Sequence, residues 1–575
     1  MRKFFTLFFL ITGLSGTRIF AQTDSSTLPG QITDLLSRMP APNQQQSDGN
    51  MQIMASLGEP GLQQMISMLS PAGTGDNTKL QYALSAYAYY ASRPGNDSLK
   101  SPCAEAYGAG LDKTIDKENK AFIIRQLQVV GGDQTVNRLK PYLTDERLCD
   151  PAARALVKIN TNEAKQALLE SVSKVLGERQ LTLVEALGDS RYEPAVASLT
   201  PMASSENKLL RKLALYALAR IGDPASETVL STAAAQAGYR YDETGATQAY
   251  LDYAARLRYK GNTAEAVKIA DTLLQNAKQD DQVAVRTAAL KLLTEAEGPG
   301  SVPLLIEAGR DPNAQYRAAA FQLARQFRDD KSTGLWVDQL TKTLDTSKAP
   351  VLDLLGTLGN KSALPALLNE LKSKDESVRL AAIRASARVG GQDALPTLLD
   401  VMKKGGSPEI AEVSSALATM KGSDLTRTVA NSLSDIPPAA QVALLNLLAA
   451  RSADSRLYDV MPLLKSPDSA VSQAAFASLK KLVHAENLPL LVNMLVNSTD
   501  STQIKSLQEA IVAASSGIQN KNRQVSIIIA EMNKNPARES LFYPVLAGMC
   551  STRSLALLMG RYDNGDESAK RLIAG

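Results

Sequence analysis

The stretch Asp-Glu-Ser-Val-Arg-Leu-Ala-Ala-Ile, residues 375–383, decides the fold because its pattern recurs along the chain. Similar stretches have acidic starts at residues 281, 311 and 468, and an earlier copy begins at Asn207. The starts at 281, 311, 375 and 468 are 30, 64 and 93 residues apart, close to one, two and three units of about 31. Such a fixed period predicts a stack of similar structural units.

A second landmark, apolar-Pro-x-Leu, recurs with the same step. Its prolines lie at positions 303, 365, 396 and 489, which differ by 62, 31 and 93 residues, and Pro462 belongs to the set with a small offset. Proline is tolerated in the first turn of a helix, where its missing N–H has no partner to lose. Each unit is therefore predicted to be two helices joined by a tight turn, the second helix beginning near the proline.

The unit around residue 375 shows how each helix begins and ends. Asp375 is expected to cap the first helix and Asp393 the second, while Gly390-Gly391 ends the first helix. The first helix carries an apolar stripe of Val378, Ala382, Ala385 and Val389. One hairpin cannot bury that stripe alone, so neighbouring units must stack. The predicted fold is all-α, an α-solenoid: a superhelix of antiparallel helix pairs with a period of about 31 residues.

The spacing, the Asp…Val-Arg pattern and the Pro-headed second helix resemble HEAT repeats, especially the HEAT-like group shared with bacterial lyase-type repeat proteins. The resemblance covers residues 145–500 well, and residues 51–145 and 500–575 only by helical periodicity. In such arrays the second helices are expected on the concave side of the stack. The resemblance implies a binding scaffold and names no partner.

The interval of about residues 239–280 breaks the 31-residue register. Its Gly261-Asn262 step, followed by Ala266 at the start of the next helix, resembles a tetratricopeptide hairpin. That motif stands alone in the chain. It is therefore interpreted as one variant hairpin within the array.

The N-terminus has the order of a secretory signal peptide. Arg2 and Lys3 precede an apolar run of residues 4–14, and the cleavage site is expected near Ala21. The run is too short to span a bilayer, and no later stretch is predicted to be a transmembrane segment. The predicted organisation is a signal peptide at 1–21, a flexible leader at 22–50 and the repeat array at 51–575. The chain is accordingly expected to be exported, to the periplasm or the cell exterior.

The charge balance argues against a nucleic-acid partner. The formal net charge is +4, and Arg2, Lys3 and Arg18 of the signal peptide supply three of these charges. The remaining surplus is too small for a polyanion-binding surface.

The three cysteines leave two alternatives open. Cys103 and Cys149 could pair in an oxidising compartment and leave Cys550 free, or all three could be small buried thiols. Their spacing fits no metal motif.

Residues suited to catalysis are scarce, which predicts no catalytic, cofactor or metal site. His484 is the single histidine, at an expected helix end with no acid placed by sequence to orient it. One histidine and three scattered cysteines do not make a zinc site.

Other charged groups are predicted to serve the fold. The acidic pairs at 280–281 and 329–330 are expected to cap helices. The recurring Arg286, Arg317 and Arg379 are expected to pair with the Asp of the adjoining repeat, forming a structural ladder.

Some aromatic residues are predicted to be buried. Trp336 is followed at helical spacing by Leu340 and Leu344 and is expected in the core. Tyr82, Tyr89 and Tyr253 are also compatible with core positions. All these residues lie in predicted helices.

Two sets of residues are candidate partner contacts. Tyr239, Arg240 and Tyr241 lie in a predicted loop, where tyrosine rings make good contact residues. The second set consists of polar positions on second helices: Asn369, Lys372, Lys403 and Asn493. These residues predict a surface that binds a protein or glycan partner.

The expected function is that of a non-enzymatic binding scaffold. The alternative is an accessory HEAT region of a larger exported carbohydrate-active hydrolase of the 3-keto-disaccharide type, whose catalytic domain would lie beyond Gly575. This alternative follows from resemblance to exported proteins that join the two parts. Residues 566–573 also read as the opening of a first helix without its second helix, so a truncated chain is expected.

Overall fold

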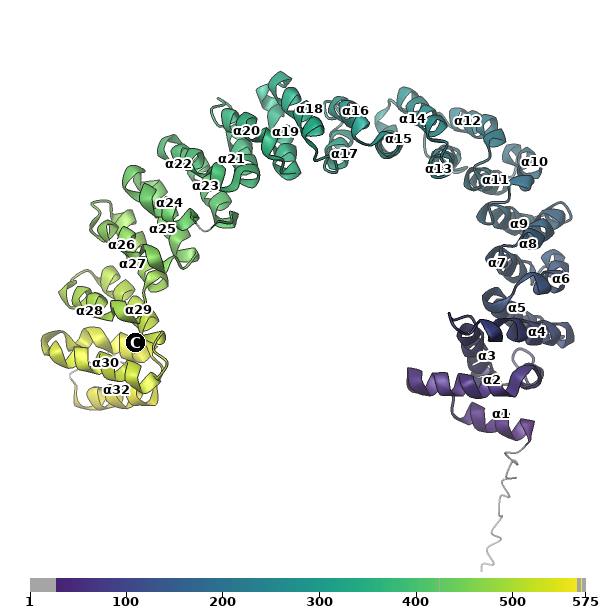
Figure 1. Ribbon diagram of the computed structural model, residues 1–575, viewed down its shortest axis with the longest axis horizontal. Coiled ribbons are helices and arrows are strands. Elements are labelled where there is room, and N and C mark those ends of the chain that lie inside the picture. Colours follow the sequence, from purple (N-terminus) through teal and green to yellow (C-terminus); the bar gives the residue numbers. More distant parts are fainter. Residues whose placement is uncertain (1–26, 423, 566–569, 571–575) are drawn as a thin grey trace, which may run out of the picture. The chain divides into compact units, whose positions relative to one another are not determined.

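The computed structural model describes residues 27–422, 424–565 and 570 of the chain (Figure 1). All regular elements in these residues are helices, which confirms the predicted all-α solenoid. The chain divides into two compact units, residues 1–296 and 297–575, called here the N-terminal and C-terminal units. The expected signal peptide at 1–21 lies outside the described residues, as does most of the helix opening expected at 566–573.

The N-terminal unit is built from consecutive α-helices with short connections. They are α1 (Leu28–Ser37), α2 (Gln44–Ser67), α3 (Thr78–Ala91), α4 (Asp97–Lys113), α5 (Lys117–Val130), α6 (Asp133–Leu139), α7 (Cys149–Ile159), α8 (Asn162–Val172), α9 (Glu178–Asp189), α10 (Val196–Leu199), α11 (Lys208–Ile221), α12 (Glu227–Gln236), α13 (Ala246–Tyr259), α14 (Thr263–Asn276) and α15 (Val283–Glu297).

The C-terminal unit continues the same alternation of first and second helices. Its helices are α16 (Val302–Ala308), α17 (Ala314–Ala324), α18 (Asp330–Lys342), α19 (Asp345–Leu358), α20 (Leu364–Glu370), α21 (Glu376–Gly390), α22 (Leu395–Lys404), α23 (Ser407–Thr419), α24 (Leu425–Ser432), α25 (Pro438–Ala450), α26 (Leu457–Val460), α27 (Ser469–Leu482), α28 (Leu488–Asn497), α29 (Ser501–Ser516), α30 (Lys521–Lys534), α31 (Tyr543–Gly548) and α32 (Thr552–Asn564).

Each unit has two layers, with first helices in one and second helices in the other. Consecutive first helices, such as α9 and α11 or α19 and α21, contact one another more extensively than the second helices α22 and α24 do. Small residues allow this approach: a Cβ added at Gly188 would lie 2.6 Å from the Cα of Ala217, and one at Gly356 would lie 2.8 Å from the Cα of Ala385. The first helices form the closely packed layer.

The layers settle which helices lie on the inner side of each stack. Within each unit the first helices follow the inner side of the bend and the second helices its outer side (Figure 1). The expectation that second helices line the concave side was wrong. The physical reason is the close spacing of the alanine-rich first helices, which shortens that layer relative to the layer of bulkier second helices.

The unit around α21 matches its predicted ends, apart from one residue. Asp375 accepts hydrogen bonds from the backbone N–H groups of Ser377 (2.8 Å) and Val378 (3.2 Å), and Gly391 follows the helix at a φ of 50°. Its predicted apolar stripe is buried. Asp393 does not cap α22: it lies in the preceding 3-10 turn, where its carboxylate binds Lys361 at 2.9 Å.

The expected flexible leader at residues 22–50 contains α1 and the beginning of α2, which are joined by a short connection at 38–43. Ile32 and Leu35 of α1 are buried because α1 packs against α2 and α3. The scattered polar residues of this stretch occupy the exposed face of α1 and the start of α2, so its composition concealed an amphipathic helix.

In the interval expected to form a variant hairpin, α13 and α14 pack as neighbours. Gly261 connects them at a φ of 91°, a backbone conformation that favours glycine. This pair also contacts the array, since α13 packs against α11 and α12. The interval is thus a helix pair within the stack.

The predicted core aromatics divide into buried and exposed residues. Trp336 and Tyr253 are buried as expected. Leu344 is 80% exposed because α18 ends at Lys342, before the stripe reaches it. Tyr82 and Tyr89, for which the sequence allowed core positions, are instead 37% and 62% exposed, on the solvent-facing side of α3.

The cysteines do not form the bond considered from the sequence. Cys103 and Cys149 are buried free thiols, and Cys550 is an exposed one. Burial raises the pKa of Cys103 to about 12 and that of Cys149 to about 11, so both thiols stay protonated at neutral pH. Of the three buried thiols in the second alternative, two are found.

No helix among the described residues is long and apolar enough to cross a membrane.

Candidate partner-binding site

Cavities recur at one position of the repeat, between the C-terminal ends of two consecutive second helices. We call each cavity a slot and name it by its two helices. The α2–α4 and α10–α12 slots of the N-terminal unit measure about 630 and 670 Å³, and the α16–α18 and α20–α22 slots of the C-terminal unit about 690 and 560 Å³. Apart from α2 and α4, which pack closely along their length, second helices contact one another sparsely, and this leaves space between their ends.

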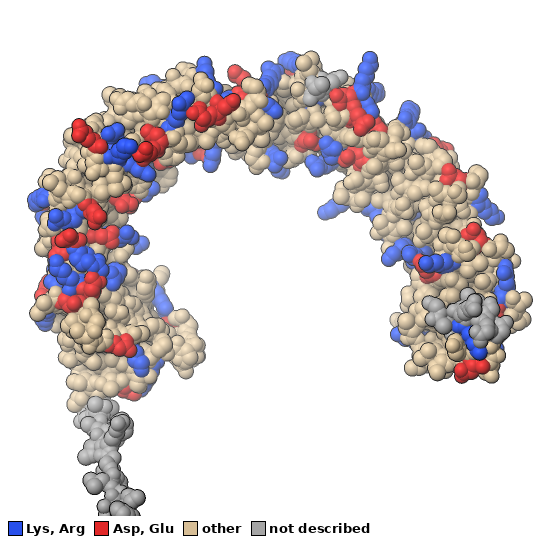
Figure 2. Space-filling model, turned by 180° about the vertical axis from the view of Figure 1, so that it is seen from behind, with Lys and Arg blue, Asp and Glu red and all other residues tan. Residues whose placement is uncertain are grey.

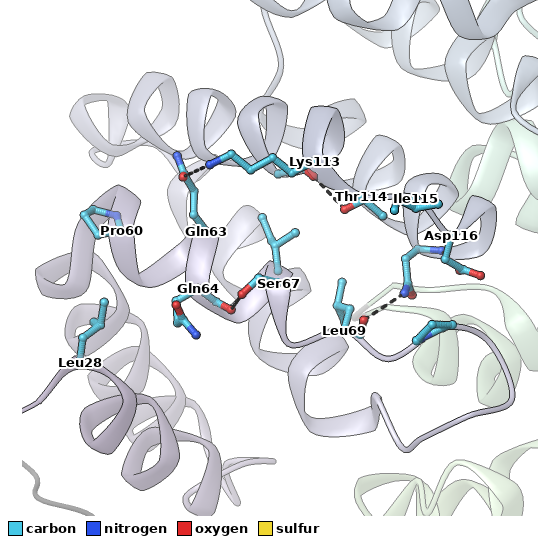
Figure 3. Close-up of a pocket in the computed structure, with 14 residues that line it drawn as sticks. Leu28, Pro60, Gln63, Gln64, Ser67, Leu69, Lys113, Thr114, Ile115 and Asp116 are labelled. Carbon is cyan, nitrogen blue, oxygen red and sulfur yellow. Dashed lines mark hydrogen bonds between the residues drawn. The ribbon is translucent and has the colours of Figure 1, made fainter.

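The α2–α4 slot has polar walls and an apolar rim (Figure 3). Lys113, in the last turn of α4, donates to the Oε1 atom of Gln63 at 3.2 Å across the opening. Asn119 donates to the backbone oxygen of Ser70 at 2.9 Å and so holds the loop after α2 in place. Ile115 is 92% exposed at the edge, where a partner could cover it.

The α10–α12 slot adjoins the loop that the sequence predicted as a contact. Its lining is rich in hydroxyl and amide groups: Thr200, Ser204, Thr228, Thr232, Gln236 and Thr244. Asp242 and Thr244 of the loop at 237–245 line the slot directly. The predicted contacts Tyr239, Arg240 and Tyr241 lie in the same loop, next to these lining residues.

The loop is held by bonds from outside it. Buried Gln282 donates to the backbone oxygen of Gly238 at 2.7 Å, and Arg240 pairs with Asp281 at 3.0 Å. Tyr239 has a φ of 54°, which turns the chain sharply and leaves Tyr241 47% exposed. Partial burial and the charge of Asp252 raise the pKa of Tyr241, so its hydroxyl remains a neutral donor. A fixed, half-exposed tyrosine is a suitable contact residue.

The two slots of the C-terminal unit are equivalent positions, two repeats apart. Arg310 and Lys342 line the α16–α18 slot, and 62 residues later Lys372 and Lys404 line the α20–α22 slot. Arg310 is held by a hydrogen bond to Gln339. A cation near the end of a second helix also complements the helix dipole.

The recurring arginines form the floor of these slots. Arg317 donates to the backbone oxygens of Asp311 and Pro312, both at 2.7 Å, and Arg379 donates to the equivalent oxygens of Ser373 and Lys374. They thereby satisfy carbonyls at the end of the preceding second helix.

The expected ladder of Arg317 and Arg379 with Asp of the adjoining repeat was wrong in its partners. Arg317 and Arg379 bind these backbone carbonyls instead, and the carboxylate of the next repeat that Arg379 reaches, at 2.6 Å, belongs to Glu409.

The acids expected as helix caps behave differently from one another. Asp329 caps α18 through the N–H of Ser332, whereas Asp330 accepts from Asn360.

Asn369, Lys372, Lys403 and Asn493 are all exposed and lie on or just after second helices, in the outer layer. Lys372 is the member of this set that lines a slot. The structure therefore brings Lys372 into a cavity with Lys404, and leaves the other three on the open helix surface.

Sequence reasoning missed the partner of His484. Its Nε2 atom lies 2.6 Å from the Oδ2 atom of Asp454, and both side chains are about half exposed. The hydrogen bond to His484 is the main cause of the lowered pKa of Asp454. The two residues occupy the same turn in consecutive repeats, so the 31-residue register could have revealed the pair. Their exposure suits a surface contact.

Charges elsewhere are mixed. Lysine, arginine and acidic side chains are interspersed on the face seen in Figure 2 and do not form one basic surface. Among the described residues, no three His, Cys, Asp or Glu side chains are placed to hold a metal ion.

The paired helices, their close-packed first layer and the slots between second helices define a helical-repeat scaffold. The chain is an α-solenoid, and residues 335–418 match the sequence family described as HEAT repeats. No curated protein matches the chain.

Solved structures that the chain matches include those of the Kap95:Nup1 complex (13% identity, TM-score 0.40, 95% of this chain and 87% of that chain covered), importin beta (12%, 0.31, 94% and 81%) and Kap121p (12%, 0.32, 91% and 57%).

Proposed function

We propose that the chain is a non-enzymatic scaffold, acting in the periplasm or outside the cell, that binds a protein partner through the slots of its second helices. The recurrence of the slot carries this proposal. Four cavities of about 560 to 690 Å³ occupy the same position in different repeats. A repeated cavity suits an extended partner that contacts several repeats at once.

The slot linings favour a polypeptide partner. Exposed apolar and aromatic residues at the edges, such as Ile115 and Tyr241, provide area for side-chain contact. The hydroxyl and amide groups within the α10–α12 slot can bond to backbone amides. Lys372 and Lys404 can pair with acidic side chains. The export signal expected in residues 1–21 supports the location.

Site-specific photo-crosslinking in cells tests the proposal. A photoreactive residue is placed at Gln236 or at Lys372, each of which lines a slot of a different unit. A matched control is placed at Lys361, which is similarly exposed but lies on the loop between a first and a second helix. We expect the two slot positions to crosslink to the same protein, and the control position to give little or none of that product.

The identity of the crosslinked protein also tests the proposed compartment. Crosslinking to one envelope or extracellular protein from both slots supports a scaffold. Crosslinks to cytoplasmic proteins would contradict the proposed location. Equal yields from Lys361 would show that the slots have no special role.

A further inference from the structure

A separate group of side chains lies on the opposite edge of the repeats, on the loops that join first to second helices. We call this side the turn edge. In the N-terminal unit, Arg191 follows α9, Arg220 is in the last turn of α11 and Arg256 is in the last turn of α13. These three residues form the arginine cluster.

Contacts between the helix ends hold the cluster together. Arg220 lies 3.4 Å from Asp189 at the end of α9. Gly222, which ends α11 at a φ of 68°, packs against the stem of Arg256: an added Cβ would lie 2.4 Å from its Cγ. Lys260 donates to the backbone oxygen of Gly222 at 3.1 Å. The ends of α9, α11 and α13 thus form one continuous surface.

The carboxylates near the cluster are already engaged. Asp189 accepts from the hydroxyl of Tyr216 at 2.6 Å and pairs with Arg220. Glu193 pairs with Lys260 at 2.7 Å. Within the described chain, Arg191 and Arg256 have no ion-pair partner. Burial and the like charge of Arg191 lower the pKa of Arg256.

The guanidinium groups are positioned before any ligand arrives. Arg256 lies over the ring of Tyr259 at 5.3 Å, and Arg220 over the ring of Tyr216 at 5.5 Å. The Nε atoms of Arg220 and Arg256 are buried without a hydrogen-bond partner. Tyr259 itself is 79% exposed beside them.

We infer that the arginine cluster binds the carboxylate side chains of an acidic peptide segment. A guanidinium group holds a carboxylate through two parallel hydrogen bonds, and Tyr259 offers a ring for the segment's apolar atoms. Two unpaired cations fit two acidic residues close together in sequence. A peptide fits better than a phosphate polymer, because Asp189 and Glu193 offset part of the positive charge around the cluster. The remaining positive charge is confined to a small area, whereas a phosphate polymer needs an extended basic surface. This inference rests on the proposed protein-binding function and names the chemistry of one contact.

The test is fluorescence anisotropy of the full chain with a labelled hexaglutamate peptide, with hexaglutamine as the neutral control. Arg191→Gln and Arg256→Gln should each weaken hexaglutamate binding about tenfold, the usual effect of losing one hydrogen-bonded charge. Arg258→Gln is the matched control, because Arg258 is on the same helix but pairs with Glu295 at 2.7 Å. Its binding should equal that of the unaltered chain.

A thermal-unfolding measurement separates binding from a structural role. Since Arg256 faces a like charge, Arg256→Gln should leave the midpoint unchanged or raise it; should that variant unfold, exposed Arg191 provides the same test. Equal losses with Arg258→Gln, absence of hexaglutamate binding, or tighter binding of polyphosphate than of hexaglutamate would overturn the inference. Crosslinking from the slots would be unaffected by any of these results, so the two proposals can fail separately.

Discussion

The turn edges of the two units differ in how their charges are arranged, although both carry paired and unpaired cations: Arg388, in the last turn of α21 in the C-terminal unit, also makes no ion pair within the described chain. In the C-terminal unit, partners reach across consecutive repeats: Lys361 to Asp393 at 2.9 Å and His484 to Asp454 at 2.6 Å. In the N-terminal unit the same edge carries Arg191 and Arg256 without such partners. The loop between first and second helices thus carries charges paired between repeats at some positions and arginines without an ion pair at others.

The difference separates charge that serves stacking from charge that is available to a ligand. An ion pair between equivalent turns joins neighbouring repeats, so its role in stacking is enough to explain its presence. Unpaired arginines held together repel one another and cost stability, which indicates a role outside the fold. Four measurements can break or sharpen this comparison.

The largest effect is expected for a buried pair of the C-terminal unit. Glu409→Ala should destabilise the helices around it by about 3 kcal/mol, because it leaves Arg379 partly buried without its carboxylate. Hydrogen exchange of α21 and α23, followed in denaturant, measures the loss. Glu412→Ala on the same helix is the control, since Glu412 makes a longer 3.3 Å contact with Arg384. Similar losses for both variants would show that burial does not set the strength of these pairs.

Helix caps should cost the same in both units. Asn207 caps α11 and Asp468 caps α27, each accepting from two backbone N–H groups. Replacing either residue with Ala should lower local stability by about 1 kcal/mol, the usual loss of a cap. Denaturant-dependent hydrogen exchange of the two helices compares them directly. A clear difference would mean that the units differ in more than charge pairing.

Adding a carboxylate should make the N-terminal turn edge resemble the C-terminal one. Tyr259→Glu places an acid beside Arg256, which should raise thermal stability slightly, by about 0.5 kcal/mol or less. It should also weaken hexaglutamate binding by occupying the cation. Tyr259→Gln is the neutral control for loss of the ring. If Tyr259→Glu bound hexaglutamate as tightly as the control, the cluster would not be the site.

The smallest effect concerns His484. Because the pKa of Asp454 is lowered in the folded chain, the contribution of the pair is present above the ordinary aspartate pKa and is lost as pH falls through the folded value. His484→Ala should raise the pKa of Asp454, measured by NMR titration, and change stability by less than about 0.5 kcal/mol at neutral pH. An unchanged pKa would contradict the assigned contact.

The repeat itself could be predicted from the sequence because its signals are local. Asp375, the buried stripe beginning at Val378 and the glycine at 391 act within one helix, and each was found where expected. Lys361 and Asp393 depend on a neighbouring repeat, so only a register carried from unit to unit could reveal their contact.

The candidate site was harder to predict because it depends on how layers pack. The loop containing Tyr241 was recognised from its composition. The slots were not, since they arise from the spacing of second helices, and no single residue marks that spacing. The same limit explains why the concave side was misassigned, and why Arg256 was overlooked: nothing in its local sequence shows that Glu193 is taken by Lys260.

Beyond α4, the sparse contacts between second helices have a mechanical consequence. A unit that bends so that its slots widen breaks few contacts, whereas bending that separates the first helices opens a closely packed layer. At Gly188 and Gly356 that layer leaves no room for even a methyl group. Each unit should therefore resist bending that separates its first helices more than bending that separates its second helices. A partner bound between second helices would increase the curvature of the unit, and part of its binding free energy would be spent on that bending.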